Sequence, residues 1–197
     1  MSKAVVGGTC PDCLGRIGWT GMGGCCCGPR IPKRAALFIG EDGRHRLPVV
    51  SDGTGGPDWI ERLRDQSFSV MVSAEGLLRS VDFQSVGPDG SQAVVLKMPE
   101  QLLGRWSLKA ARDLAEQLGF STPQPEVACL MREQVSDDDV RDMGLRCMLV
   151  AHQPMFDAQT SVFGLLGLDR YFIRCLSAER NLTRDSYDSD VGFVFMG

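Results

Sequence analysis

Five of the eight cysteines of this chain lie within eighteen residues near the N-terminus, where closely spaced thiols could bind a metal ion. The segment reads CPDCLGRIGWTGMGGCCCG, and its possible ligands are Cys10, Cys13, Cys25, Cys26 and Cys27. Its many glycines leave too little apolar surface for a core of its own. Zn²⁺ takes four tetrahedral ligands and binds thiolates well. These residue types at this spacing therefore predict a metal-binding segment.

Cys10 and Cys13 form the better-defined half of this segment. The sequence CPDC places their two sulfurs on one tight turn, and Gly15 lets backbone N–H groups turn toward them. This half resembles the knuckle of zinc-ribbon proteins, in which CPxC is followed closely by glycine. The resemblance covers residues 10–28 and implies a structural zinc site there. It implies nothing about the fold of the remaining chain.

The second half of the segment is less regular. A second C-x-x-C is absent, because Gly24 stands three residues before Cys27. The eleven residues between Cys13 and Cys25 are enough for a small hairpin that returns the chain to the metal. The expected ligands are therefore Cys10, Cys13, Cys25 and Cys27, with Cys26 as a substitute.

Histidine is missing from the neighbourhood of these thiols. A catalytic zinc keeps an open coordination position and usually has histidine or a carboxylate among its ligands. The two histidines of the chain, His45 and His152, are both distant from the cysteine cluster in sequence. The pattern therefore favours a structural zinc ion. An iron–sulfur cluster, redox-active thiols or a disulfide, and a metal-free segment remain alternatives.

The first 36 residues are basic, whereas the rest of the chain is acidic. They hold five Lys or Arg and one Asp, a net charge of +4, so the other residues sum to −8 in a chain of net charge −4. Four ligating thiolates and one Zn²⁺ would reduce the first value to about +2. Nucleic acid is thus an alternative partner for this segment alone. The candidate contacts are Arg16, Trp19, Arg30, Lys33 and Arg34. Trp19 could instead pack over the metal site.

The composition is that of a globular protein, with 43% hydrophobic and 23% charged residues in 197 positions. Two prolines near residue 30 indicate a boundary, which divides the chain into a metal-binding arm, 1–34, and an α+β domain, 35–197. No stretch reaches the roughly 18 apolar residues that a membrane-spanning helix needs, and the N-terminus does not read as a secretory signal. We therefore expect a cytoplasmic protein, or a component of a particle assembled in the cytoplasm.

Apolar runs and turn residues predict an α+β fold with a mainly antiparallel sheet and two or three helices. Strands are expected over 35–40, 45–51, 68–75, 77–86, 92–98, 127–131, 145–151, 171–179 and 191–197. The Asp-Gly sequence between the first two predicts a turn that joins them as a β-hairpin. Helices are expected over 57–66, 99–118 and 136–144. Gly119 fits the left-handed position that follows the second of these helices, and the third opens with a capping box in the sequence SDDD. The run VFGLLGL fits a helix or a turn. Pro48 predicts that its strand lies at a sheet edge.

Three further cysteines stand singly in apolar runs. There, Cys129, Cys147 and Cys175 are expected to behave as small buried hydrophobic residues. A catalytic pair of Cys147 and His152 is conceivable, but the sequence supplies no orienting partner and no oxyanion donors.

The sequence favours a non-enzymatic, zinc-stapled interaction or structural protein. Such a protein would act as an adaptor or as a subunit of a larger assembly, for example a virion or secretion particle, with a protein partner or further copies of itself. The first alternative is a nucleic-acid-associated regulator that uses the basic arm. The second is a thiol redox or iron–sulfur protein.

Overall fold

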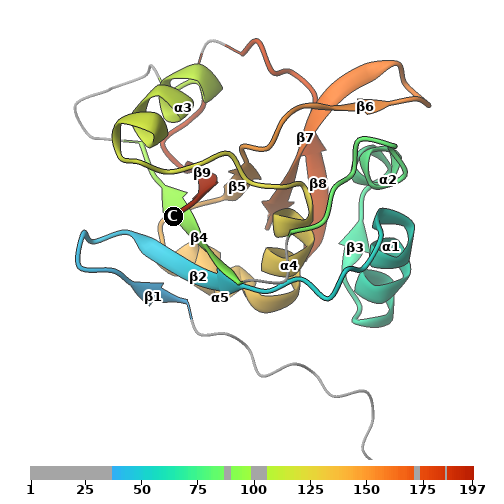
Figure 1. Ribbon diagram of the computed structural model, residues 1–197, viewed down its shortest axis with the longest axis horizontal. Coiled ribbons are helices and arrows are strands. Elements are labelled where there is room, and N and C mark those ends of the chain that lie inside the picture. Colours follow the sequence, from blue (N-terminus) through green and yellow to red (C-terminus); the bar gives the residue numbers. More distant parts are fainter. Residues whose placement is uncertain (1–36, 87–89, 99–105, 171–173, 185) are drawn as a thin grey trace, which may run out of the picture. The chain divides into compact units, whose positions relative to one another are not determined.

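The computed structural model describes residues 37–86, 90–98, 106–170, 174–184 and 186–197 (Figure 1). The expected boundary between residues 34 and 35 lies outside these ranges and stays a prediction.

One mixed sheet dominates the described residues. Its strand order is β1-β2-β4-β9-β5-β7-β8-β3, and β6 pairs with β7 beside this path. The β5–β9 and β3–β8 pairs are parallel and the other pairs are antiparallel. The α+β class with a mainly antiparallel sheet is therefore confirmed. The strands are β1 (Phe38–Ile39), β2 (His45–Val49), β3 (Ser69–Val70), β4 (Ser91–Leu96), β5 (Cys147–Val150), β6 (Met155–Asp157), β7 (Val162–Asp169), β8 (Cys175–Glu179) and β9 (Val191–Met196).

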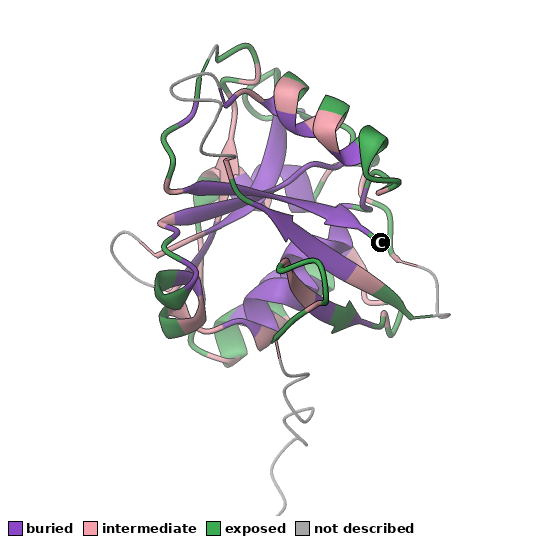
Figure 2. Ribbon diagram, turned by 90° about the vertical axis from the view of Figure 1, so that its left-hand side faces the viewer, coloured by how far each residue is buried: buried purple, intermediate pink, exposed green. Residues whose placement is uncertain are grey.

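The helices lie on both faces of the sheet (Figure 2). On one face, α3 packs through Leu108, Ala111 and Ala115 onto the apolar side chains of β4, β5 and β9. The larger core on the other face contains buried residues of the four remaining helices. The described part of the chain thus has more helices than the two or three expected. They are α1 (Gly56–Asp65), α2 (Val72–Leu78), α3 (Leu108–Gln117), α4 (Glu126–Gln134) and α5 (Asp137–Asp142).

The predicted hairpin at residues 35–51 is present as β1 and β2, with Gly43 of its turn at φ +74°. The prediction that Pro48 lies in an edge strand is wrong, because β2 lies between β1 and β4. Pro48 pairs with Gln92, whose carbonyl accepts a hydrogen bond from Gly197 on the opposite side. This antiparallel pair therefore exchanges no ladder bonds, so the missing N–H of Pro48 costs none on the side of β4.

Helix boundaries follow the predicted capping residues. Ser136 and Asp139 form the expected capping box of α5, and Gly119 after α3 has φ +76°. The expected helix over 99–118 is confirmed only for its second part, because α3 begins after the N-cap Ser107. The beginning of that expected helix lies outside the described residues.

Helices replace expected strands at two places in the chain. Residues 127–131 belong to α4, in which every residue from Glu126 to Glu133 is buried. A helix buried on all sides has no amphipathic period that separates it from a buried strand. Residues 72–78 form α2, and the chain after it runs to residue 86 without a strand. The two strands expected over 68–86 are therefore reduced to the short β3.

The run VFGLLGL is strand β7 rather than a helix or a turn. Its glycines permit close packing instead of chain reversal. A Cβ at Gly164 would lie 3.0 Å from the Leu77 side chain, and one at Gly167 would lie 2.7 Å from the Leu149 side chain. The strands expected near 145–151 and 191–197 are confirmed as β5 and β9, which lie side by side in the middle of the sheet.

Candidate functional site

The most distinctive feature of the sheet is an interruption between β5 and β6. Leu149 of β5 pairs with Gly167, and Met155 of β6 pairs with Gly164, so residues 150–154 stand opposite only two residues of β7. Pro154 in this stretch has no N–H to donate to a ladder. The chain therefore leaves the sheet after β5 and pairs with the same neighbour, β7, again at Met155.

The His152 side chain replaces the missing strand partner. Its Nε2 accepts the Leu166 N–H at 2.9 Å, and its Nδ1 lies 2.6 Å from the Gln153 carbonyl. Because a carbonyl can only accept, Nδ1 carries the proton and the imidazole is neutral. Burial, assisted by the nearby Arg112 charge, lowers the pKa of His152 to about 4. His152 is therefore a buried structural connector.

Arg112 of α3 holds the same stretch from the other side. Its Nη2 donates to the carbonyls of His152 at 2.8 Å and Ala151 at 3.4 Å. A backbone segment that has left its sheet would otherwise bury carbonyls without donors. Together, His152 and Arg112 fix the course of residues 151–155.

A groove of about 600 Å³ opens beside this stretch. Its volume lies within the range typical of ligand-binding pockets, roughly 300 to 1,000 Å³. Three loops and the start of β7 form its walls. The lining residues are Val81, Asp82, Gln84, Thr122, Pro123, Gln124, Pro125, Gln153, Pro154, Met155 and Phe163. We call this feature the Gln-Pro groove, because the dipeptides Gln124-Pro125 and Gln153-Pro154 contribute to two of its walls.

Glu126 joins two of the loops that form the groove. Its fully buried carboxylate accepts hydrogen bonds from Trp59 Nε1 at 3.1 Å and from the Val86 N–H at 2.7 Å. The Glu126 N–H in turn donates to the Gln84 carbonyl at 3.4 Å. The loop over residues 79–86 is thereby attached to the start of α4.

Gly56 sets the position of the same loop at its other end. A Cβ on Gly56 would lie 1.9 Å from the carbonyl oxygen of Leu78 and 3.1 Å from the Phe83 ring. The backbones of α1 and α2 therefore meet at a distance that only glycine permits.

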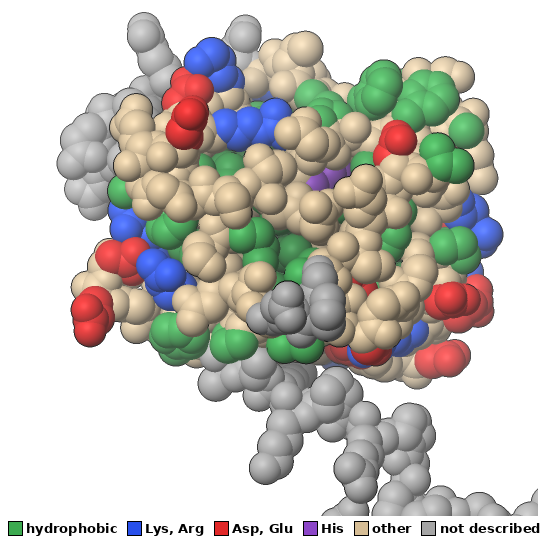
Figure 3. All heavy atoms as spheres, viewed as in Figure 1, with side chains coloured by type: hydrophobic (Ala, Val, Ile, Leu, Met, Phe, Trp, Pro, Cys, Tyr) green, Lys and Arg blue, Asp and Glu red, His purple; other side chains and the backbone are tan. Residues whose placement is uncertain are grey.

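The hairpin of β6 and β7 extends an apolar surface from the groove. Phe156 and Phe163 face each other across the two strands with ring centroids 5.3 Å apart. Phe163 is 53% exposed and Val81 in the facing loop is 99% exposed. In Figure 3, hydrophobic side chains gather at the end of the molecule where Figure 1 shows β6. Such gathered apolar side chains are typical of interaction sites.

Asp157 holds the hairpin in place. Its carboxylate accepts hydrogen bonds from the Gln159 N–H at 2.9 Å, Thr160 Oγ1 at 2.7 Å and Arg180 Nη2 at 2.7 Å. It also packs against α2 at Gly76, where a Cβ would lie 2.6 Å from the carboxylate. The exposed aromatic pair therefore stands on a fixed support.

Two smaller hollows do not gather a reactive set of groups. In the first, of about 150 Å³, burial raises the pKa of the Cys147 thiol and raises the pKa of Tyr187 to about 12, so both groups are neutral at pH 7.

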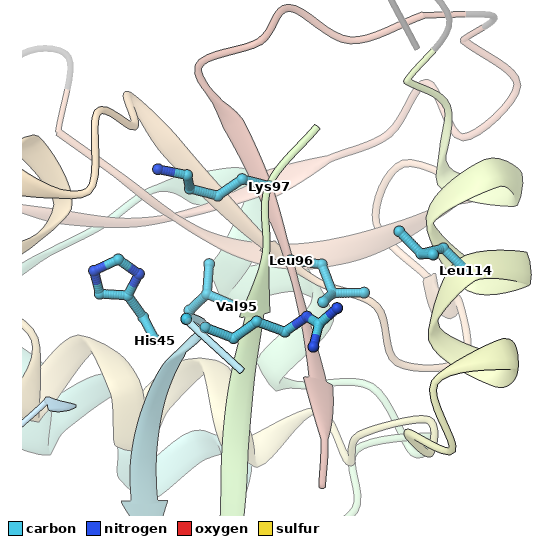
Figure 4. A pocket seen from close by; sticks show the side chains of 7 residues that line it. His45, Val95, Leu96, Lys97 and Leu114 are labelled. Atoms are coloured by element: carbon cyan, nitrogen blue, oxygen red, sulfur yellow. The ribbon is translucent and has the colours of Figure 1, made fainter. Parts of the chain in front are cut away.

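In the second hollow, of about 200 Å³, His45 and Lys97 project on one side of β4, whereas Leu96 and Leu114 lie on the other (Figure 4). Lys97 Nζ donates to the Met143 carbonyl at 2.9 Å.

The residues predicted from the sequence as metal ligands or anion contacts all precede residue 37. Cys10, Cys13, Cys25, Cys26, Cys27, Arg16, Trp19, Arg30, Lys33 and Arg34 lie outside the described residues, so their roles stay predictions. In the described ranges, no group of three or more His, Cys, Asp or Glu side chains is arranged to hold a metal ion.

The single cysteines behave as expected. Cys129, Cys147 and Cys175 are buried free thiols. The conceivable pair of Cys147 and His152 is not assembled, since both imidazole nitrogens of His152 bond to backbone groups. Sequence reasoning missed the Gln-Pro groove, although its repeated Gln-Pro dipeptides in two separate loops were a visible signal.

The described residues thus define an α+β protein with an open, mostly uncharged groove and an adjoining apolar hairpin. Comparison with protein-family models, with curated proteins and with solved structures found no match. Among the described helices, none combines the length and apolar character required to cross a membrane.

Proposed function

We propose that this protein is a non-enzymatic interaction protein that binds a protein partner through the Gln-Pro groove and the adjoining hairpin. The observation that carries the proposal is the continuity of the groove with exposed Val81 and Phe163. Apolar side chains at this degree of exposure gain free energy when a partner covers them. The fixed positions of the loops and the hairpin support a preformed binding surface.

Site-specific photocrosslinking in the cells that naturally produce the protein tests this function. A photoreactive phenylalanine analogue at Val81 is expected to form a discrete protein adduct. The matched position is Val72, which is 75% exposed on α2 and does not line the groove. The Val81 adduct is expected to disappear when Phe163→Ser is added. Equal adducts from both positions, or none from Val81, would contradict a partner site at the groove.

A structural zinc site in the N-terminal arm is the second part of the proposal. Its support is the thiol pattern of Cys10, Cys13, Cys25 and Cys27. Four thiolates form a closed tetrahedral shell that stabilises a segment without a core. Such an arm would suit an adaptor or a subunit of a larger assembly in a reducing compartment such as the cytoplasm. The free thiols of the domain fit that compartment.

Elemental analysis and a visible spectrum of the full-length protein test the zinc site. We expect one zinc ion per chain and no visible absorbance. Cys13→Ser is expected to lose most of the metal, whereas the matched variant Cys26→Ser should retain it. A brown, iron-containing protein would replace zinc with an iron–sulfur cluster, and a metal-free folded protein would remove the metal site altogether.

A further inference from the structure

We infer that the Gln-Pro groove binds an extended, uncharged peptide segment with apolar side chains, supplied by the partner. This inference rests on the proposed function, because it specifies what the same groove accepts.

The amide side chains of the groove can bind the free backbone groups of a partner. Gln84, Gln124 and Gln153 come from three different loops, and all three are exposed. Within the described ranges, none of their side-chain amides makes a hydrogen bond. Each amide can donate and accept one or more hydrogen bonds. An extended peptide offers N–H and C=O groups on both edges, whereas a helix has already bonded its own to itself.

The charge of the groove selects against charged ligands. Asp82 is the only lining residue with a charged side chain, and its Oδ2 already accepts the Phe156 N–H at 3.1 Å. An anionic ligand group would lose water without gaining a partner of opposite charge, and a cationic group would gain only the exposed Asp82 carboxylate, an ion pair that contributes little in solvent. A neutral segment avoids this cost.

The apolar part of the lining favours hydrophobic side chains along that segment. Pro123, Pro125 and Met155 are buried residues of the lining, and the exposed Phe163 lines the groove as well. The apolar surface continues beyond the groove onto Phe156 and Val162, which are each 38% exposed. A small molecule would fill the groove and leave this extension uncovered, whereas a peptide segment that passes through the groove reaches it.

Peptide titration followed by nuclear magnetic resonance tests the inference on the full-length protein. The probe is a pool of synthetic neutral peptides composed of Leu, Phe, Pro, Ser and Asn. Two matched pools carry additional Glu or additional Lys. The neutral pool is expected to shift the side-chain amide signals of Gln84, Gln124 and Gln153. Each charged pool should bind about tenfold more weakly.

Two valine variants provide the matched comparison. Val81→Ser should weaken binding of the neutral pool by roughly five- to tenfold, because it removes apolar area at the groove. Val72→Ser is an identical change on α2, outside the groove, and should leave binding unchanged. Neither side chain is buried, so both variants are expected to fold.

The outcomes separate the inference from the proposed function. Equal binding of the three pools, or stronger binding of a charged pool, overturns the uncharged occupant. Amide shifts that depend on protein concentration alone would assign the groove to a second copy of this chain. If no pool binds while the Val81 photocrosslink persists, the peptide class is wrong and the interaction function stands. If the photocrosslink is also absent, both fail.

Discussion

His152→Phe is expected to lower the free energy of unfolding at pH 7 by about 2 to 4 kcal/mol. The phenyl ring fills the space of the imidazole but can neither accept the Leu166 N–H nor donate to the Gln153 carbonyl. The buried Leu166 N–H then has no acceptor, because the neighbouring chain has left the sheet at this point. Denaturant unfolding followed by the fluorescence of the buried Trp59 and Trp106 measures the change.

The same variant should remove a pH dependence of stability. The folded-state pKa of His152 is about 4, below the ordinary histidine value of 6.5. The unfolded chain therefore binds a proton near pH 6.5, while the folded chain stays neutral until about pH 4. Stability is lost as the pH falls through this window, by on the order of 3 kcal/mol, and the loss is complete below about pH 4.

His45 provides the control for this titration. It is the other histidine of the chain, is only half-buried, and has no ladder bond to replace. His45→Phe should keep most of the decline between pH 6.5 and 4, although burial also lowers the pKa of His45. An undiminished decline in the His152→Phe protein would assign the effect to other groups.

Gly56→Ala is expected to destabilise the protein by about 3 kcal/mol or more. The added methyl group would lie 1.9 Å from the Leu78 carbonyl oxygen, a backbone atom that cannot rotate away. Relief requires that α1 and α2 separate, which also displaces the loop that carries Val81 and Gln84. We expect weaker binding at the groove as well as a lower midpoint of denaturant unfolding.

The adjacent Gly55→Ala is the matched control. Its Cβ would make an ordinary contact of 3.6 Å with Asp58, and Gly55 has φ −73°, which alanine adopts without strain. We expect a change within about 1 kcal/mol, because a poorer N-cap and a less flexible unfolded chain act in opposite directions. Similar losses from both variants would show that the close approach of α1 and α2 is not the cause.

Local signals predicted much of the fold. The Asp-Gly turn of the first hairpin, the capping box at Ser136 and the glycine after α3 all act within a few residues, so their effects are visible in a single sequence. The elements that escaped prediction are set by tertiary contacts. Every residue of α4 from Glu126 to Glu133 is buried, charged residues included, because both the sheet and other helices cover it, and β7 contains glycines because neighbouring side chains press against its backbone.

The groove could not be predicted from local patterns for the same reason. Its walls come from three loops that are separated by tens of residues, and its position depends on the departure of the chain from the sheet at His152. The sequence carried the amides and prolines of the groove, but only the register of β7 against β5 and β6 shows that they converge. The cysteine arm is the opposite case, since its prediction rests on short spacing alone.

Because the Leu166 N–H donates to the His152 imidazole instead of to a strand carbonyl, the Leu166 amide has an unusual role. Most amides in a sheet exchange their hydrogen with solvent when two backbone ladders separate. The Leu166 amide can be released by rotation of one side chain together with a shift of residues 151–155, of which Gln153, Pro154 and Met155 line the groove. Its rate of hydrogen exchange therefore reports the opening of the groove wall separately from the unfolding of the sheet. A molecule held in the groove would slow that exchange before it changed the exchange of the central strands.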